Sequence, residues 1–332
     1  VSVLAAEARG PIYFQSATVF DFDVILDGMH GAQPTTGLGY LSMPAGASAA
    51  QPVPAMVILP GSGGISPGRE EEYAKLLNRH GIAAFIVEYY EPRGMTRDFS
   101  YMLRSGSVTE FDIVTDAYSA LKLLSSSPAI DPKRIGVMGF SYGAMATRIA
   151  MDDRIRAVLA PQSPGFALYA DFYGPCFQKL GTTRTNGAPL LTLRVTADSS
   201  NDLAACAQRE KELEALGVTV ERHTFEGAGH AWEITTPQQM NDKPYIVGCE
   251  LDYDAQGFAW MNGRRVSDVD ADTSRLERIA ARYFGNSELM DCAKYGYLVG
   301  KNEAATQGGY DALSGFLEKW FALTPAQAAR PQ

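Results

Sequence analysis

The sequence has more acidic than basic residues and contains no basic run. Its 332 residues include 29 lysines and arginines against 38 aspartates and glutamates, which gives a net charge of −9 at pH 7. A protein that binds nucleic acid needs a basic patch to neutralise phosphates, so nucleic acid is not an expected partner. Long apolar runs are also missing, because the longest, near residues 82–87, has the length of a buried strand. Since a membrane-spanning helix needs roughly 18 apolar residues, no membrane span is expected.

Histidine and cysteine are scarce, with four of each. Neither an HExxH pattern nor a CxxC pair is present, so these zinc-binding arrangements are excluded. The acidic stretch at residues 268–272 lacks the spacing and the bidentate glutamate of a calcium-binding loop. We therefore expect no metal and interpret that stretch as a solvated loop that caps a helix. Four cysteines allow three disulfide pairings, and their number alone leaves buried free thiols equally open.

Short apolar runs alternate along the chain with stretches in which apolar residues recur every three or four positions. The first kind predicts strands and the second predicts helices. Strands are predicted at residues 54–59, 82–88, 134–140, 157–160, 190–195 and 218–225, and helices at residues 70–79, 109–124, 142–151, 203–216 and 310–323. Apolar strands joined by helices predict an α/β fold with a mostly parallel, twisted sheet that has helices on both faces.

Two segments differ from this alternation. Residues 1–45 are rich in β-forming residues and interrupted by glycine, which indicates an antiparallel edge of the sheet. Residues 235–309 are polar and rich in aspartate and glycine, and they separate the last predicted sheet strand from the final helix. The sequence shows no internal repeat and no low-complexity linker. We therefore expect residues 1–332 to form a single domain with a C-terminal insertion at 235–309.

The pattern G-x-S-x-G occupies residues 139–143, with Ser141 at its centre. The bare pattern is common, but here a predicted strand leads directly into it and a predicted helix follows directly. This context is typical of a nucleophile elbow, a tight strand-to-helix turn that exposes a serine oxygen above the sheet. Glycine is needed on both sides because side chains there would collide with neighbouring backbone. We predict that Ser141 is a nucleophile and that the helix N-terminus stabilises a developing oxyanion.

A nucleophilic serine needs a base, and the histidines are the candidates. His80 is explained by a helix end before a glycine, and His30 lies in the N-terminal β region, before the elbow. His223 lies inside a predicted strand, where alternation leaves its direction open. His230 follows that strand in a loop, beyond the C-terminal end where such sheets bind ligands. It also fits the chain order serine, acid, histidine, so His230 is predicted as the base.

The acid is expected in a loop that follows a strand between the serine and the histidine. Asp198 comes three residues after the predicted strand 190–195. Asp202 is the alternative, although its place directly before a predicted helix suits an N-cap. Glu226 is too near the histidine in sequence to be favoured. Asp198 is therefore predicted as the acid that orients the histidine.

A second oxyanion donor is expected from the turn that follows an earlier strand. The glycine-rich run at residues 60–64 is such a turn, at the end of the predicted strand 54–59. We predict that the backbone N–H of Ser62 acts together with that of Tyr142. A glycine-rich turn that binds nothing is the alternative.

Taken together, these residues resemble the α/β-hydrolase fold and, within it, the dienelactone hydrolase-like family. The resemblance covers roughly residues 54–233 and the final helix, and includes EYYEPRG at 88–94, IDPKRIGVMGFS at 130–141 and GAGHAW at 227–232. It implies an α/β-hydrolase fold and the hydrolysis of carboxylic esters through an acyl-enzyme. It also implies that no cofactor is needed and that the partner is a small-molecule ester substrate.

The sequence differs from the namesake enzymes of that family in two places. They carry a cysteine nucleophile where this chain has Ser141, and a glutamate in the turn where this chain has Ser62 and Gly63. A serine is a poor nucleophile without its base, whereas a cysteine ionises nearly alone, so dienelactone itself is not the expected substrate. Two alternatives remain open: an amide or peptide hydrolase with the same triad, and a non-catalytic binding protein on a hydrolase fold.

The resemblance also bears on the cysteines. Some secreted members of the group look similar in having a cysteine in the helix after the acid and a pair around the C-terminal insertion. For this chain the resemblance implies the disulfides Cys176–Cys206 and Cys249–Cys292. Disulfides imply an oxidising compartment, so the chain is expected to be periplasmic or secreted, with a cytoplasmic location as the alternative.

The insertion contains more aromatic residues than an idle polar loop needs. It begins directly after the His230 loop, so it leaves from the rim of the expected site. We expect it to wall one side of the substrate pocket, with Trp260 selecting among esters of different size. A packing appendage beside the final helix is the alternative.

Overall fold

The computed structural model describes residues 3–266 and 268–323, and of residues 283–290 only the backbone. At its centre lies an 8-stranded sheet with the order β1-β2-β4-β3-β5-β6-β8-β9. Strands from β4 to β9 in this order are parallel, whereas β2 pairs antiparallel with both β1 and β4. The strands are β1 (Gly10–Thr18), β2 (Gln33–Ser42), β3 (Val53–Leu59), β4 (Ala83–Glu88), β5 (Ile130–Phe140), β6 (Tyr169–Phe172), β8 (Leu190–Val195) and β9 (Val220–Phe225). This is the predicted α/β-hydrolase arrangement, with its antiparallel edge at the N-terminus.

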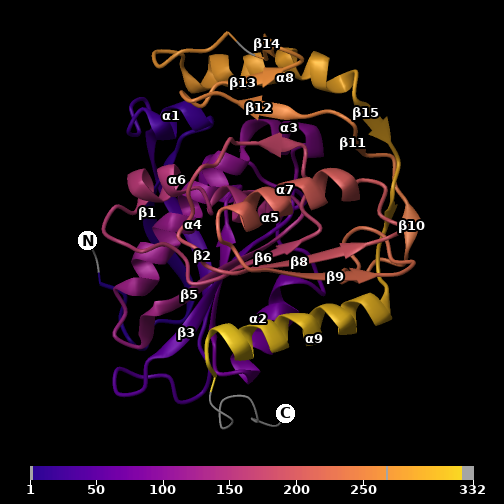
Figure 1. Ribbon diagram of the computed structural model, residues 1–332. Coiled ribbons are helices and arrows are strands. Elements are labelled where there is room, and N and C mark those ends of the chain that lie inside the picture. Colours follow the sequence, from indigo (N-terminus) through magenta and orange to yellow (C-terminus); the bar gives the residue numbers. More distant parts are fainter. Residues whose placement is uncertain (1–2, 267, 324–332) are drawn as a thin grey trace.

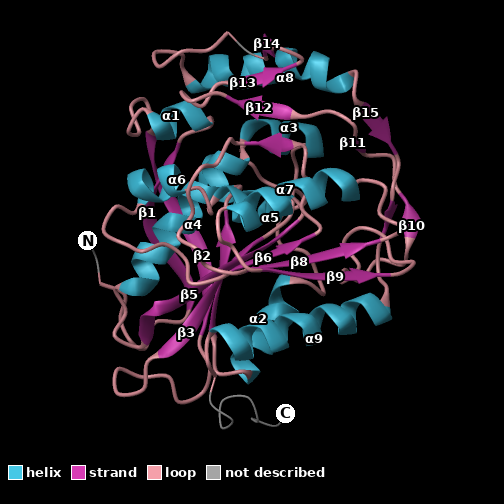
Figure 2. Ribbon diagram, viewed as in Figure 1, coloured by secondary structure: helices cyan, strands magenta, loops and turns pink. Residues whose placement is uncertain are grey.

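Helices cover both faces of the sheet, as Figure 2 shows. On one face lie α2 (Glu70–Arg79) and α9 (Glu303–Trp320). On the other lie α4 (Glu110–Ser125), α5 (Tyr142–Ile149), α6 (Asp153–Leu159) and α7 (Leu203–Ala215). The side chains of β3 are buried along its whole length, which explains why its sequence is continuously apolar rather than alternating. Each face therefore has its own hydrophobic cluster, and the sheet separates the two.

Most predicted elements are present, but two predictions were wrong, one in the middle of the chain and one in its N-terminal segment. Residues 157–160 are not a strand, since they lie at the end of α6, whose N-cap Asp152 accepts a hydrogen bond from the N–H of Arg154. A run of four apolar residues suits a buried helical turn as well as a strand. The strand that pairs with β5 on the side away from β3 is instead β6, which was not predicted. Residues 22–26 of the β-rich N-terminal segment form the short helix α1 (Phe22–Leu26).

The insertion begins beyond β9 and arches over the end of the sheet where α1 and α3 (Tyr101–Ser107) lie, as Figure 1 shows. One part of it descends along the side of the molecule to α9, which starts seven residues before the predicted helix. Its elements are β10 (Gln239–Met240), β11 (Pro244–Ile246), β12 (Leu251–Tyr253), β13 (Ala259–Met261), β14 (Arg264–Arg265), α8 (Arg275–Met290), β15 (Ala293–Tyr295) and β16 (Leu298–Val299). The main body also contains two short elements, η1 (Glu91–Arg93) and β7 (Gln178–Lys179). β7 pairs with β12 of the insertion.

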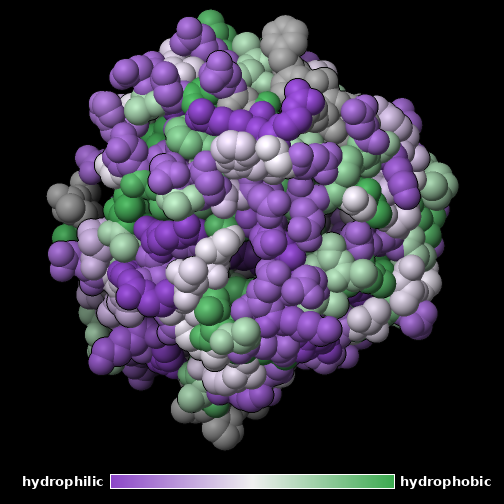
Figure 3. Space-filling model, turned by 45° about the horizontal axis from the view of Figure 1, so that its top comes forward, coloured by the Kyte–Doolittle hydropathy of each residue, from purple (hydrophilic) through white to green (hydrophobic). Residues whose placement is uncertain are grey.

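Two disulfides are present, Cys176–Cys206 and Cys249–Cys292, with the pairing that the resemblance implied. The first joins the loop after β6 to α7, and the second joins two positions within the insertion. Figure 3 shows hydrophilic and hydrophobic residues mixed over the face that carries the insertion. Among the described helices, none combines the length and the apolar character that crossing a membrane requires.

Candidate active site

Ser141 lies at the turn between β5 and α5, as the elbow predicts. Its backbone has a φ of 52° and a ψ of −109°, a conformation that costs a non-glycine residue free energy. The turn is held because the Ser141 N–H donates to Phe172 O at 2.9 Å. A Cβ on Gly139 or on Gly143 would collide with neighbouring backbone, so both positions require glycine. The elbow therefore presents the serine hydroxyl at the C-terminal edge of the sheet.

His230 lies in the loop after β9, with its imidazole between the serine and the acid. Its Nε2 is 2.8 Å from Ser141 Oγ and its Nδ1 is 2.6 Å from Asp198 Oδ2. Two tyrosine rings pack edge-on against the imidazole, Tyr173 at 4.7 Å and Tyr297 at 5.3 Å between ring centroids. The histidine ring is thus confined on two sides, and its two nitrogens are aligned with the two predicted partners.

The insertion supports the His230 loop through its backbone. The His230 N–H donates to Leu298 O at 2.8 Å, and the Gly300 N–H donates to His230 O at 3.0 Å. This is a parallel bridge between the loop and β16. The approach is so close that a Cβ on Gly229 would collide with the carbonyl group of Leu298. The insertion therefore fixes the position of the histidine as well as lying near it.

Asp198 lies in the loop after β8, and its side chain is fully buried. Oδ1 accepts hydrogen bonds from the Ser200 N–H at 2.9 Å and from the Ser200 hydroxyl at 2.5 Å. Oδ2 accepts one from Asn201 Nδ2 at 3.0 Å, in addition to its contact with His230. Burial raises the pKa of this carboxyl, but the attraction of His230 and the hydrogen bonds outweigh burial and lower the pKa below its usual value. Asp198 is therefore held as a carboxylate.

The turn at residues 61–64, from which the second oxyanion donor is predicted, follows β3. Its carbonyl oxygens face two tyrosines, since Tyr89 Oη lies 2.5 Å from Gly61 O and Tyr90 Oη 2.8 Å from Ser62 O. The Gly64 N–H closes the turn by donating to Gly61 O at 2.8 Å, which leaves the Ser62 N–H outside that bond. Tyr142 is the first residue of α5, so its N–H has no acceptor inside the helix. Both residues line the same cavity as Ser141 and His230.

A cavity of about 290 Å³ opens over the serine and the histidine. Residues of the insertion form much of its wall, among them Ile246, Phe258 and Tyr297, as expected of a pocket wall. The expectation for Trp260 was wrong, because it is not among the lining residues and its indole N–H donates to Asp254 Oδ2 at 2.7 Å. Successive residues of β13 face opposite sides of the strand, so Ala259 lines the cavity and Trp260 does not, whereas Phe258 lies just before the strand and also reaches the cavity.

Part of the cavity wall is charged. Glu110 accepts a hydrogen bond from the Tyr142 hydroxyl at 3.0 Å and pairs with Arg282 of α8 at 3.2 Å. Burial raises the pKa of Glu110, but Arg282 and the hydrogen bonds together lower it below its usual value. Asp21 lies on the same wall beside Arg278, and burial raises its pKa to about 6. The pocket thus combines an apolar lining with paired charges.

The other candidates lie elsewhere. His30 and His223 are exposed, and His80 ends α2 with its Nδ1 3.7 Å from Glu318. Asp202 caps α7 by accepting hydrogen bonds from the N–H groups of Ala204 and Ala205. Glu226 accepts a hydrogen bond from Thr196 on the surface.

Sequence reasoning missed several residues that contact the site. Ser200 and Asn201 follow Asp198 in the run DSSN, and polar residues directly after a predicted acid are a signal that could have found them. Nothing in the sequence marks Tyr173 or Tyr297 as neighbours of the histidine, because they come from distant segments that meet only in the fold.

A sequence model of the dienelactone hydrolase family matches residues 39–260 of the chain. The chain belongs to the dienelactone hydrolase family. No curated protein sequence matches it. The match to the dienelactone hydrolase family ends before α8 and β16, so the segment that supports the His230 loop lies outside the matched residues.

Solved structures of similar proteins are distant in sequence. A putative dienelactone hydrolase from Klebsiella pneumoniae is 17% identical, with a TM-score of 0.49, over 67% of this chain and 88% of that one. An esterase from Thermogutta terrifontis with bound propionate is 20% identical, with a TM-score of 0.48, over 59% of this chain and 80% of that one. An acetyl ester-xyloside bifunctional hydrolase from Caldicellulosiruptor lactoaceticus is 19% identical, with a TM-score of 0.45, over 60% of this chain and 80% of that one.

Proposed function

We propose that this member of the dienelactone hydrolase family cleaves carboxylic esters with Ser141 as the nucleophile, His230 as the base and Asp198 as the acid. One observation carries the proposal. The Ser141 hydroxyl, the two imidazole nitrogens and the Asp198 carboxylate form a continuous hydrogen-bonded row, with contacts of 2.8 and 2.6 Å, at the wall of a cavity large enough for a small ester. Roles rather than sequence positions identify such a triad.

In the first half of the reaction, Ser141 Oγ attacks the ester carbonyl carbon while His230 Nε2 takes the hydroxyl proton. The carbonyl π electrons move to oxygen, and the backbone N–H groups of Ser62 and Tyr142 stabilise the resulting oxyanion. The carbon–oxygen bond to the alcohol then breaks, and the protonated imidazole gives its proton to the departing alkoxide. An acyl group remains on the serine, and a neutral alcohol leaves.

In the second half, water replaces the alcohol. His230 takes a proton from the water as its oxygen attacks the acyl carbon, and the same two N–H groups stabilise the second oxyanion. Collapse of this intermediate breaks the bond to Ser141 Oγ, which receives the proton from the imidazole. The carboxylic acid leaves and the enzyme returns to its starting state. Asp198 holds the imidazole in the required tautomer throughout.

The Ser141→Ala and His230→Ala variants should each lower kcat on a nitrophenyl ester by about three orders of magnitude or more. The double variant should lose little further, because the two residues act as a unit. A fluorophosphonate probe should label the wild-type protein and not Ser141→Ala, with the adduct located by mass spectrometry. His223→Ala, which removes an exposed histidine, is the matched control and should keep full activity.

The same experiment separates the alternatives. Absence of an adduct on Ser141 would favour a non-catalytic binding protein. Labelling together with faster cleavage of an amide than of the matched ester would favour an amide hydrolase. The two disulfides indicate an oxidising compartment, and we propose a periplasmic or secreted location. We also propose that residues 1–332 work as one unit, because the insertion contributes both to the pocket and to the His230 loop.

A further inference from the structure

Asn201 links the carboxylate of Asp198 to a buried cluster of charged side chains. The side-chain amide of Asn201 is buried, and its Nδ2 donates to Asp198 Oδ2 and to Tyr173 O, both at 3.0 Å. Its Oδ1 accepts a hydrogen bond from Arg194 Nη1 at 3.2 Å. The Asp198 oxygen that receives Asn201 is the one that contacts His230. Asn201 is therefore one step from the imidazole without touching the cavity.

The arginine determines which way the amide faces. An asparagine amide has an acceptor on one side and donors on the other, and the two orientations fill the same space. A guanidinium has donors only, so it stabilises the orientation with Oδ1 toward Arg194 and Nδ2 toward Asp198. The reverse orientation would place an amide oxygen against a carboxylate and an amide NH₂ against a guanidinium. Arg194 thus dictates that Asp198 meets a hydrogen-bond donor.

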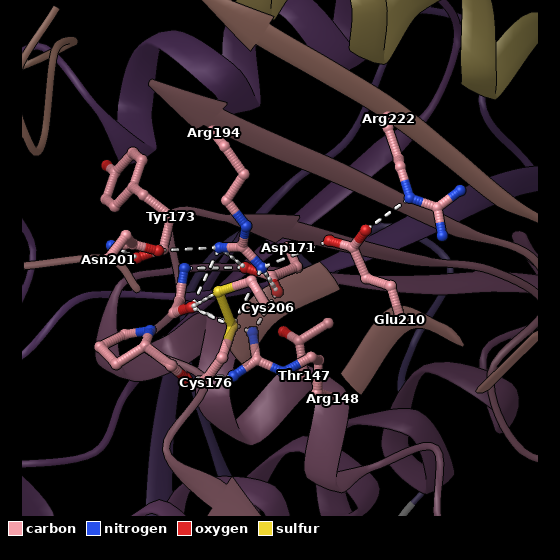
Figure 4. Close-up of polar contacts among 12 residues, drawn as sticks. Thr147, Arg148, Asp171, Tyr173, Cys176, Arg194, Asn201, Cys206, Glu210 and Arg222 are labelled. Carbon is pink, nitrogen blue, oxygen red and sulfur yellow. Dashed lines mark hydrogen bonds and ion pairs between the residues drawn. A yellow bond between two sulfur atoms is a disulfide. The ribbon is translucent and has the colours of Figure 1, made fainter. Parts of the chain in front are cut away.

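Arg194 is itself held in place on several sides, as Figure 4 shows. Its Nη2 lies 2.6 Å from Asp171 Oδ2, and its Nη1 donates to Gly174 O at 3.0 Å. Asp171 is fully buried at the end of β6 and also pairs with Arg148 of α5. Burial raises the pKa of Asp171, but the two arginines lower it below its usual value. Buried charges are stable only when they are paired in this way.

The disulfide Cys176–Cys206 adjoins the same cluster. Cys176 Sγ lies 3.6 Å from Arg194 Nη2, and the loop that carries Cys176 also supplies the carbonyl of Gly174. The disulfide ties this loop to α7, the helix that follows Asn201 in the chain. The cluster, the loop and the helix are therefore linked to one another beside the loop that carries the acid.

We propose that Asn201 is a positioning residue for Asp198, and that Arg194 acts on catalysis through it by fixing the orientation of its amide. The inference rests on the proposed function, in which Asp198 orients His230. With the Asn201 N–H in place, Oδ2 keeps its negative charge and its direction as the imidazole takes up and releases a proton. Without it, the carboxylate rotates toward its remaining Ser200 donors and the imidazole loses its alignment.

Two substitutions at Asn201 test the hydrogen bond. Asn201→Ala should lower kcat about 10- to 100-fold with KM nearly unchanged, the size expected for a hydrogen bond to a charged group. Asn201→Asp has the same shape but presents an oxygen to Asp198, so its kcat should fall at least as far. If Asn201 only fills space or only pairs with Arg194, Asn201→Asp will keep kcat within twofold of the wild type, and the proposal is wrong. The matched control is Asn186, an exposed asparagine that donates to Pro164 O and Phe166 O, whose Ala and Asp variants should keep kcat.

A double-mutant cycle tests the part played by Arg194. Arg194→Lys keeps the buried positive charge but cannot bond to Asp171, Gly174 and Asn201 in one geometry. It should lower kcat severalfold in the wild type and have no further effect on kcat in Asn201→Ala, while its effect on Tm remains in both. Equal losses of kcat in both backgrounds would show that Arg194 acts by another route.

Ser141→Ala separates this inference from the proposed function. If Ser141→Ala retains activity, the proposed function fails. If Ser141→Ala is inactive while Asn201→Asp is fully active, only this inference is refuted.

Discussion

Glu233 is a fully buried carboxyl group near His230. Its Oε2 accepts a hydrogen bond from the Tyr173 hydroxyl at 2.8 Å, and the ring of that tyrosine packs against His230. Burial raises the pKa of Glu233 to about 7, although the neighbouring Arg69 and the Tyr173 hydroxyl lower it. The ordinary value of this pKa is 4.5, so the folded protein binds a proton here that the unfolded chain has already lost near neutral pH.

The protonated form of Glu233 should therefore stabilise the fold at low pH. A folded-state pKa above the unfolded value gives stability that is present below pH 4.5 and is lost as pH rises through about 7. When the pH is raised from 5 to 8, the free energy of unfolding of Glu233→Gln should rise by about 2 to 3 kcal/mol relative to that of the wild type. The reason is that the glutamine carries no titrating proton. Urea unfolding at the two pH values measures this. Glu226→Gln, at an exposed position, should show no such change, and an equal change in both variants would contradict the assignment.

At the scale of single residues, the sequence is informative where the chemistry is local. The place of Ser141 at a strand-to-helix turn could be predicted because the elbow needs its glycines, its strand and its helix within a dozen positions. That His230 and Asp198 lie in one row with Ser141 could be predicted from their places after β9 and β8. Asn201 could not be assigned a role, because its orientation depends on Arg194 near the end of β8 and on charges from two further elements.

At the scale of elements, the hairpin of β12 and β13 is one of the parts of the insertion that line the pocket. Phe258 lies at its turn, where it lines the cavity and packs under the guanidinium of Arg265 at 3.7 Å. Trp260, two residues later, is directed to Asp254 instead. The hairpin is attached to the main body through the pairing of β12 with β7.

Phe258→Ala should therefore change the preference among esters of different acyl length. Removing the ring enlarges the cavity, so the ratio of kcat/KM for a hexanoate ester to that for an acetate ester should rise severalfold. Trp260→Ala is the matched control, since it removes an aromatic ring from the same hairpin but not from the cavity wall. It should lower Tm and leave the ratio unchanged. If the ratio of kcat/KM for the two esters shifts in Trp260→Ala and not in Phe258→Ala, then Trp260 rather than Phe258 lines the pocket.

Apart from the start of α9, long elements with a consistent pattern could be predicted to within a few residues, and short ones could not. The helix α2 lies at its predicted residues because its apolar face, its acidic first turn and its glycine end agree. β6 has four residues, too few for periodicity to distinguish it from the apolar turn of α6 that was taken for a strand. The two- and three-residue strands of the insertion are fixed by partners far away in the chain, such as β7 for β12, rather than by their own composition.

At the scale of the whole molecule, the disulfide Cys249–Cys292 closes a segment that includes part of the pocket wall, Phe258 among it. Its cysteines are 43 residues apart in sequence. Replacing both by serine should lower the free energy of unfolding by about 2 to 4 kcal/mol, because the unfolded chain regains the freedom of that loop. Urea unfolding of the double variant measures the loss, and the wild type should release no thiol in denaturant without a reductant. A double variant as stable as the wild type would show that packing alone holds the insertion.

The backbone bridge between β16 and the His230 loop has a consequence for how this enzyme can diversify. If the insertion only lined the pocket, it could be replaced by another segment. Each replacement would then change the range of substrates and leave the catalytic residues unaffected. Here the same segment that shapes the pocket carries Leu298 and Gly300, whose backbone groups hold the histidine. Insertions and deletions in it therefore risk the turnover of every substrate at once. We therefore expect tolerated changes in this segment to fall on side chains that face the cavity, and changes in the length of the backbone around residues 298–300 to impair the enzyme.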